Sequence, residues 1–208
     1  PMNNPPRGYR RIMLKLSGEA LMSDRGFGIS PDVLGTIASE IHDVHKMGLE
    51  IALVIGGGNI FRGMNSSAYR MRRTPADNIG MLATVMNAVA MGEVLYDLGV
   101  DSQVMSAIEM PRVAETFTAK KAVEHLSNKK IVLLAAGTGN PFFSTDTAAA
   151  LRALEIDADV LLKATKVDGV YDADPVNNPE ARLFKTLTYN EYIERGLKVM
   201  DMTSITLA

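Results

Sequence analysis

The sequence has no cysteine among its 208 residues, and only three histidines. The lack of cysteine excludes disulfides, thiolate metal sites and cysteine nucleophiles. His42 and His45 share one predicted helix, whereas His125 lies far from both in the sequence. A histidine-based metal site is therefore not expected.

The sequence also lacks an excess of charge of either sign, with a formal net charge of −2. A protein that binds nucleic acid regardless of sequence needs a basic surface to displace counterions, so no nucleic-acid partner is expected. Hydrophobic residues make up 47% and charged residues 22%. This balance is typical of a globular protein with a substantial core.

No apolar run is expected to reach the length of a membrane span. The first six residues are polar and rich in proline, without the apolar centre of a secretory signal. We therefore expect no membrane association and a cytoplasmic location. Residues 1–8 are expected to form a flexible lead-in, and residues 9–208 a single domain.

Short apolar runs alternate with longer helical stretches along the chain. This alternation predicts right-handed crossovers and a mostly parallel sheet in a three-layer α/β/α sandwich. Ligands of such folds bind beyond the carboxyl ends of the strands. The predicted strands are residues 12–16, 51–55, 102–106, 131–136 and 159–163.

One predicted helix, from Thr74 to about Leu98, is apolar on nearly all sides. Thr74 and Pro75 predict its start, as a capping residue followed by proline in the first turn. A helix without a polar face is buried in its own domain or against a partner subunit. For a chain of this length we favour a subunit interface. Its apolar residues include Ile79, Met81, Leu82, Val85, Met86, Val89, Met91, Val94 and Leu95.

Three predicted strands end in unusual loops. The first ends at Lys15, and the second runs into three consecutive glycines at 56–58. Glycines leave backbone N–H groups open to the close approach of oxyanions. Ser144 and Thr145 stand where a helix N-terminus would offer unpaired N–H groups, which also suits phosphate. Lys15 and Arg62 would supply two cations.

Each loop alone has an ordinary structural explanation, as a tight turn, a solvated lysine or a helix cap. Their occurrence together at one edge of a parallel sheet instead favours a site for more than one phosphate group. The sequence contains neither the G-x-x-x-x-G-K-[ST] phosphate loop nor a G-x-G-x-x-G fingerprint after the first strand. The predicted site thus belongs to neither of those classes.

These segments resemble the amino acid kinase family and, within it, the bacterial uridylate kinases. The resemblance extends from Tyr9 to Ala208, and the stretch 137–143 (Gly-Thr-Gly-Asn-Pro-Phe-Phe) is its most specific part. It implies transfer of the γ-phosphate of ATP to UMP, giving UDP and ADP for pyrimidine nucleotide synthesis. The matching blocks are residues 15–20, 54–63, 80–87, 136–146, 162–171 and 197–202.

The resemblance also implies roles for individual residues. Lys15, Arg62 and Asp146 would be catalytic, with Asp146 orienting Lys15 or a metal-bound water, while Asp201 lies near the centre without an assigned role. The ATP-binding residues would be Lys15, Leu16, Ser17, Gly18, Gly58, Arg62, Thr165, Tyr171 and Asp174. The UMP-binding residues would be Gly57, Asp77, Thr138, Gly139, Asn140, Pro141, Phe142, Phe143, Ser144 and Thr145.

Transfer would be direct and in line, without a covalent intermediate, because a UMP phosphate oxygen is already anionic and needs no general base. Charge would develop on the equatorial oxygens of the phosphoryl group. Mg²⁺ would be bound mainly through ATP phosphates rather than by a protein metal site. The family further implies a homohexamer, activation by GTP and inhibition by UTP, and the loop 23–28 resembles a segment tied to the GTP response.

Two alternatives remain open at this point. An acetylglutamate or aspartate kinase of the same fold would lack the stretch 140–143 and the placement of Asp77. A nucleotide sensor or storage protein without catalysis would not require Lys15, Arg62 and Asp146 together. Two departures from the family are also present: Ser144 stands where threonine is common, and members continue beyond the position of Ala208, so the domain is expected to lack its last segment.

Overall fold

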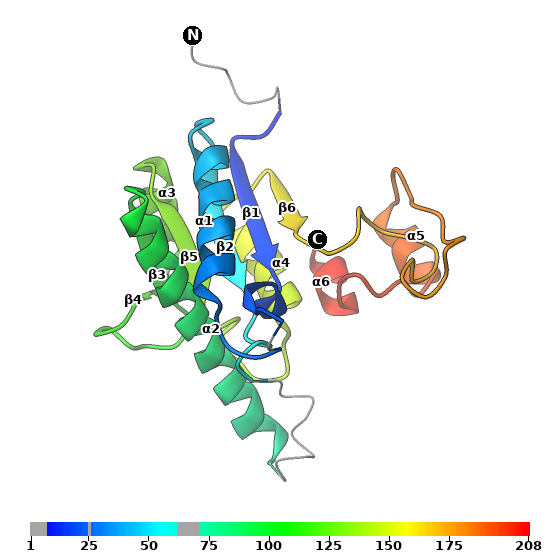
Figure 1. Cartoon of the computed structure of the whole chain (residues 1–208), viewed down its shortest axis with the longest axis horizontal. Coiled ribbons are helices and arrows are strands. Elements are labelled where there is room, and N and C mark those ends of the chain that lie inside the picture. Colours follow the sequence, from blue (N-terminus) through cyan, green and yellow to red (C-terminus); the bar gives the residue numbers. More distant parts are fainter. Residues whose placement is uncertain (1–7, 25, 62–70) are drawn as a thin grey trace.

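The computed structural model describes residues 8–24, 26–61 and 71–208 (Figure 1). Within these ranges one sheet has the strand order β4-β3-β5-β2-β1-β6, and every strand pairing is parallel. The five predicted strands are confirmed. The strands are β1 (Arg11–Leu16), β2 (Glu50–Ile55), β3 (Ser102–Ser106), β4 (Glu115–Thr116), β5 (Ile131–Ala135) and β6 (Val160–Lys163).

Helices cover both faces of this sheet. Apolar residues of α1 and α2 form one core with Ile12 and Leu16 of β1, whereas α3 and α4 form a second core with Met13. Successive residues of a strand point to opposite faces, so one strand contributes to both cores. The three-layer α/β/α sandwich is confirmed. The helices are α1 (Pro31–His45), α2 (Arg73–Asp97), α3 (Ala119–Ser127), α4 (Thr145–Glu155), α5 (Tyr189–Glu194), α6 (Met202–Leu207) and the short 3-10 helix η1 (Gly18–Leu21).

The central strands β2 and β5 are buried at every position. Apart from Glu50 at the start of β2, both strands are unbroken apolar runs, which is the pattern of parallel strands covered on two sides. Full burial of one leucine or isoleucine side chain contributes about 1.5–3 kcal/mol. These two strands therefore anchor the sheet and fix the positions of the loops that follow them.

The predicted cap at Thr74 makes Pro75 the first helical residue, but α2 begins two residues earlier, at Arg73, and Arg72 at the capping position makes no side-chain cap. The prediction that Thr74 caps the helix is therefore wrong. The first turn is held instead by Arg73, whose Nε lies 2.7 Å from each carboxylate oxygen of Asp77. Such a pair four residues apart stabilises a helix start without a cap.

One side of α2 packs on the sheet and the other is exposed. Leu82, Met86, Val89 and Tyr96 lie on the exposed side, from 40% to 73% accessible. Among the described residues α2 is also the one helix long and apolar enough to cross a membrane, with half of its most apolar window buried. The expectation that no apolar run is as long as a membrane span is therefore wrong. The run is long because apolar residues lie both on the side of α2 that packs on the sheet and on its exposed side.

Beyond β6 the chain leaves the sheet edge and forms a separate lobe that carries α5 and α6 (Figure 1). The lobe includes one antiparallel bridge between Tyr171 and Leu183. Helix α6 packs against α4. The lobe thus lies next to the carboxyl ends of β1 and β6.

Candidate active site

The loops that follow β1 and β2 contact each other closely. The backbone N–H of Gly56 donates to the carbonyl of Leu16 over 2.9 Å. Gly18 faces the second loop so closely that a Cβ there would lie 2.6 Å from Asn59 Oδ1 and nearer still to the Gly56 carbonyl. Glycine at position 18 is therefore a requirement of packing between the loops.

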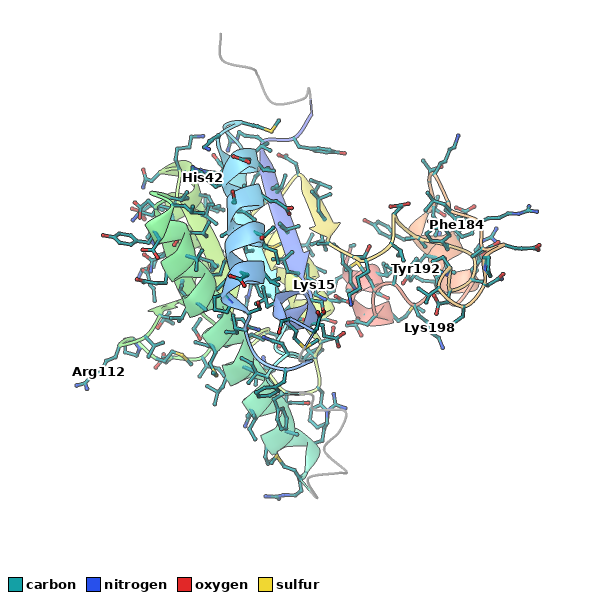
Figure 2. The ribbon with its side chains drawn as sticks, in the orientation of Figure 1. Lys15, His42, Arg112, Phe184, Tyr192 and Lys198 are labelled. Atoms are coloured by element: carbon teal, nitrogen blue, oxygen red, sulfur yellow. The ribbon has the colours of Figure 1, made fainter. Side chains whose placement is uncertain are left out.

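The ammonium group of Lys15 forms a buried ion pair. Its side chain is 8% exposed, and Nζ lies 2.7 Å from Asp146 Oδ1 in the first turn of α4. That oxygen is fully buried and accepts no hydrogen bond of good geometry from the described residues, so the Lys15 ammonium is what compensates its charge. The structure thus brings together the two residues that the sequence predicted at the reacting centre; Figure 2 shows where Lys15 lies.

A second lysine, which the sequence analysis did not include, lies on the same carboxylate. Lys163 Nζ is 2.7 Å from Asp146 Oδ2 and also donates to the Val199 carbonyl. Its signal was its position at the end of a predicted strand. However, only the register of β6 against β1, which pairs it with Lys15, shows that the two side chains are neighbours.

A cavity of about 140 Å³ lies beside this centre, between the glycine loop and α2. Apart from Asp77, the α2 residues that line this cavity were not predicted; they recur with helical spacing. Gly57 fits against this side of α2 because an added Cβ would lie 2.7 Å from the Gly80 carbonyl. The predicted residues that line the cavity are Gly57, Gly58, Asp77, Asn140, Phe143 and Thr145; the others are Phe61, Ala76, Gly80, Met81, Thr84 and Gly137.

The loop after β5 is fixed to α2 at two points. The Ala136 N–H donates to Thr84 Oγ1 over 2.8 Å, and the Phe142 N–H donates to Asp77 Oδ2 over 2.8 Å. Ala136 and Phe142 both have positive φ, of 61° and 73°, a conformation that costs a non-glycine residue energy and persists only where neighbours enforce it. These two bonds hold the loop against the cavity.

Not every residue predicted for UMP lines this cavity. Thr138, Gly139, Pro141 and Phe142 belong to the same loop but lie outside the lining. Ser144 caps α4, since its Oγ accepts from the N–H groups of Asp146 and Thr147. In the structure the hydroxyl of Ser144 is therefore used by the helix.

The ATP residues predicted beyond β6 fall into two neighbouring cavities. Thr165 lines a mainly apolar cavity of about 290 Å³, which Lys163 also lines. Tyr171 and Asp174 line a second cavity of about 500 Å³. Val199 borders both, so the three predicted residues lie around one part of the lobe but not in one pocket.

Two predictions from the sequence concern residues that the structure does not fully describe. Arg62 lies outside the described residues, and so does Arg25 of the loop 23–28. The end of that loop contacts the glycine loop, because Gly28 exchanges hydrogen bonds with Asn59: Gly28 N–H to Asn59 O over 2.8 Å, and Asn59 Nδ2 to Gly28 O over 3.0 Å. Asn59 in turn pairs with Asn87 of α2.

Asp201 joins the lobe to α4. Its carboxylate accepts from Ser144 Oγ, from Thr147 Oγ1 over 3.0 Å and from the Ser204 N–H over 2.8 Å, which caps α6. Burial raises the pKa of Asp201, but these hydrogen bonds outweigh it and hold the pKa below its ordinary value. Asp201, to which the sequence gave no role, therefore fixes the start of α6 on the start of α4.

The Asp201→Asn substitution is expected to lower the free energy of unfolding by about 1 kcal/mol at neutral pH, because hydrogen bonds to a partly exposed charge are lost. A carboxylate with a lowered folded pKa stabilises above its ordinary pKa, and that contribution disappears as pH falls through the folded value. The difference between wild type and variant should thus shrink below about pH 4. Urea unfolding at several pH values measures it, and a difference independent of pH would contradict this role.

Residues 8–24, 26–61 and 71–208 contain no group of three or more histidine, aspartate or glutamate side chains arranged to hold a metal ion. The carboxylate next to Lys15 has both oxygens in ion pairs with lysines.

Glycine loops, a buried lysine–carboxylate cluster and a cavity at the carboxyl edge of a parallel α/β/α sheet define a protein that handles phosphate groups without a P-loop. The amino acid kinase family model matches residues 10–208, and this chain belongs to that family.

Known relatives cover nearly all of the chain. It is 57% identical over 198 residues to the uridylate kinase of Magnetococcus marinus, covering 95% of this chain and 82% of that protein. It is 53% identical over 205 residues to the uridylate kinase of Colwellia psychrerythraea, with 99% and 83% covered. The solved UMP kinase of Bacillus anthracis superposes with a TM-score of 0.94 at 39% identity, covering 97% of this chain and 84% of that one.

Proposed function

We propose that this chain is a nucleoside monophosphate kinase that transfers the γ-phosphate of ATP to UMP. Relatives more than 50% identical over nearly the whole chain are uridylate kinases. The observation that carries the proposal is the placement of the lysine–carboxylate cluster. Thr145 lines the 140 Å³ cavity, Asp146 follows it, and Lys163 on the same carboxylate lines the 290 Å³ cavity of the lobe. Two ligands in these cavities would meet at the cluster.

In this proposal Lys15 stabilises the charge of the phosphoryl group as it passes between the two nucleotides. Asp146 holds Lys15 in place before substrates arrive, so no reorganisation is needed during transfer. The acceptor is a phosphate oxygen that is already anionic, and direct in-line displacement requires no general base. Mg²⁺, held mainly by ATP phosphates, would neutralise part of the phosphate charge.

The remaining site residues are proposed as the two nucleotide-binding surfaces. The cavity beside Asp77 would take UMP, with Gly57 and residues 138–145 around it. The loops at 15–18 and at Gly58, with Arg62, would face the ATP phosphates. Thr165, Tyr171 and Asp174 would contact the nucleoside part of ATP.

The direct test is ADP release from Mg²⁺-ATP with single acceptors: UMP, CMP, dTMP, AMP, N-acetylglutamate and aspartate. Turnover selective for UMP is the expected result. Turnover of N-acetylglutamate or aspartate instead would assign the chain to another branch of the family. Binding of UMP without turnover of any acceptor would support a sensor and refute the proposed activity.

The contact between Arg73 and Asp77 leads to a prediction about UMP affinity. Arg73 occupies both oxygens of Asp77, which we propose as the acceptor for the ribose hydroxyls. The Arg73 side chain is half exposed, and an ion pair of this kind contributes little to stability. Arg73→Met should therefore lower the KM for UMP by about twofold to fivefold, whereas Asp77→Asn should raise it about tenfold or more, the loss expected for hydrogen bonds to a charge.

Initial rates at varied UMP and saturating ATP measure both variants. The KM for ATP serves as the internal control and should change less than twofold, since Arg73 and Asp77 lie away from the lobe. A higher KM for UMP in Arg73→Met would show that the arginine contributes to UMP binding rather than competing for Asp77.

We further propose that the exposed stripe of α2, formed by Leu82, Met86, Val89 and Tyr96, is covered by another copy of the chain, within a homohexamer. Such a run of large apolar side chains is unfavourable in water. Met86→Glu places a charge in its centre, and light scattering after gel filtration should show a smaller species than wild type. Glu40→Gln, at an exposed position of α1, is the control. An unchanged mass for Met86→Glu would refute this interface.

Activation by GTP, inhibition by UTP and a cytoplasmic location complete the proposal. The hydrogen bonds between Gly28 and Asn59 give the loop 23–28 direct contact with the glycine loop of the site. An effector that moves this loop would thus act on the phosphate-binding backbone.

A further inference from the structure

Lys163 and Lys15 form a matched pair across two strands. Met13 pairs with Leu161 in the register of β1 and β6, and both pack on the side of the sheet that α4 covers. Two residues further along, Lys15 pairs with Lys163. Because side chains alternate between the faces of a strand, both lysines point to this same side, where α4 begins.

One carboxylate lies between the two ammonium groups. Asp146 Oδ1 is 2.7 Å from Lys15 Nζ, and Oδ2 is 2.7 Å from Lys163 Nζ. The three side chains are 8%, 13% and 18% exposed for Lys15, Asp146 and Lys163. Charges so poorly solvated interact more strongly than they would in water.

We propose that Lys163 is a positioning residue for phosphoryl transfer: it compensates the charge of Asp146, so that the charge of Lys15 remains available to the phosphoryl group. With both lysines the cluster carries one net positive charge. Without Lys163 the remaining pair is neutral, and Asp146 holds Lys15 as its only compensating charge. The inference rests on the proposed kinase activity.

Lys163 also connects this cluster to the lobe beyond β6. Its ammonium donates to the Val199 carbonyl, and its side chain lines the 290 Å³ cavity with Thr165 and Met200. Figure 2 shows Lys15 at the end of β1, beside the lobe that carries Tyr192 and Lys198. A purely structural role, as a hydrogen-bonded link to Val199, therefore competes with the electrostatic role.

Three substitutions separate these roles. Lys163→Gln keeps a hydrogen-bond donor and removes the charge, Lys163→Arg keeps both, and Lys163→Met removes both. The control is Lys166→Met, an exposed lysine three residues further along. Thermal unfolding of each variant shows whether it folds.

The expected result is that Lys163→Met and Lys163→Gln both lower kcat about tenfold or more, somewhat less than the loss of a direct electrostatic stabiliser. The KM for UMP should change less than about twofold, and Lys163→Arg should retain kcat within about threefold of wild type, because its charge is kept. Calorimetry should show weaker binding of ATP by the Met and Gln variants. Wild-type kcat in Lys163→Gln would leave only the structural link and overturn the inference.

A double-mutant cycle with Asp146→Asn tests whether Lys163 acts through the carboxylate. If it does, Lys163→Met should lower kcat by a clearly smaller factor in the Asp146→Asn protein than in wild type, because the effects of substituting coupled residues are not additive. Equal losses in both proteins would contradict the inference. Failure of the proposed activity is a separate outcome, seen when wild type does not phosphorylate UMP. In that case the affinities of the Lys163 variants for ATP still decide the role of the charge.

Discussion

Replacing Lys15 by methionine is expected to lower kcat about a hundredfold or more, in line with other single electrostatic stabilisers. The KM for UMP should stay within about threefold of wild type, because an interaction made mainly in the transition state contributes little to substrate binding. The protein should remain folded, since Asp146 keeps its ion pair with Lys163. Steady-state kinetics with UMP and Mg²⁺-ATP measure the effect.

Lys46→Met is the matched control, because Lys46 is an exposed lysine at the C-terminal cap of α1, paired with Asp43. Its kcat should equal that of wild type. A Lys15→Met protein that is folded and retains wild-type kcat would remove Lys15 from the reaction. A large rise in the KM for UMP with unchanged kcat would instead place Lys15 in ground-state binding of UMP.

The Gly18→Ala substitution is expected to be the second most damaging single change. The added Cβ would lie 2.6 Å from Asn59 Oδ1 and nearer still to the Gly56 carbonyl. A backbone carbonyl cannot move aside as a flexible side chain can, so the loops after β1 and β2 must separate. Overpacking of this kind costs about 1–3 kcal/mol, and about 2–4 °C of Tm accompanies each kcal/mol in a chain of this size.

Gly35→Ala is the control for Gly18→Ala. Gly35 lies inside α1, where an added Cβ meets no atom within 4 Å. This substitution should stabilise the protein by about 0.5–1 kcal/mol, because alanine loses less conformational freedom in a helix. Thermal unfolding and kcat are measured together; a Gly18→Ala protein with the Tm and kcat of wild type would show that the two loops can separate without cost.

Most of the fold followed from local patterns in the sequence. The apolar runs predicted five strands, and the alternation with helices predicted the layers, because both signals depend on neighbouring residues. Strand β4 was missed because it has two residues, Glu115 and Thr116, and carries no apolar run. The start of α2 was misplaced because the ion pair of Arg73 with Asp77 took the place of a capping side chain.

The position of the candidate residues was predictable where it followed from the ends of strands. Lys15 and the glycine loop stand at such ends, and the resemblance added Asp146. Lys163 was missed because its neighbour across the sheet depends on strand register, which the local sequence does not give. Ala76, Gly80 and Thr84 on the α2 side of the 140 Å³ cavity were missed for a similar reason. Their sequence is that of ordinary helix residues, and only the packing of the loop after β5 against α2 shows that they face the cavity.

The central claim is that the γ-phosphate of ATP is transferred to UMP at Lys15, and ³¹P NMR of one reaction mixture tests it most directly. Wild-type protein with Mg²⁺-ATP and UMP should convert these two substrates into equal amounts of ADP and UDP, without release of inorganic phosphate. Over the same time, the Lys15→Met protein should leave ATP and UMP nearly unchanged. Release of inorganic phosphate in place of UDP, or UDP formation at the same rate by Lys15→Met, would contradict the account.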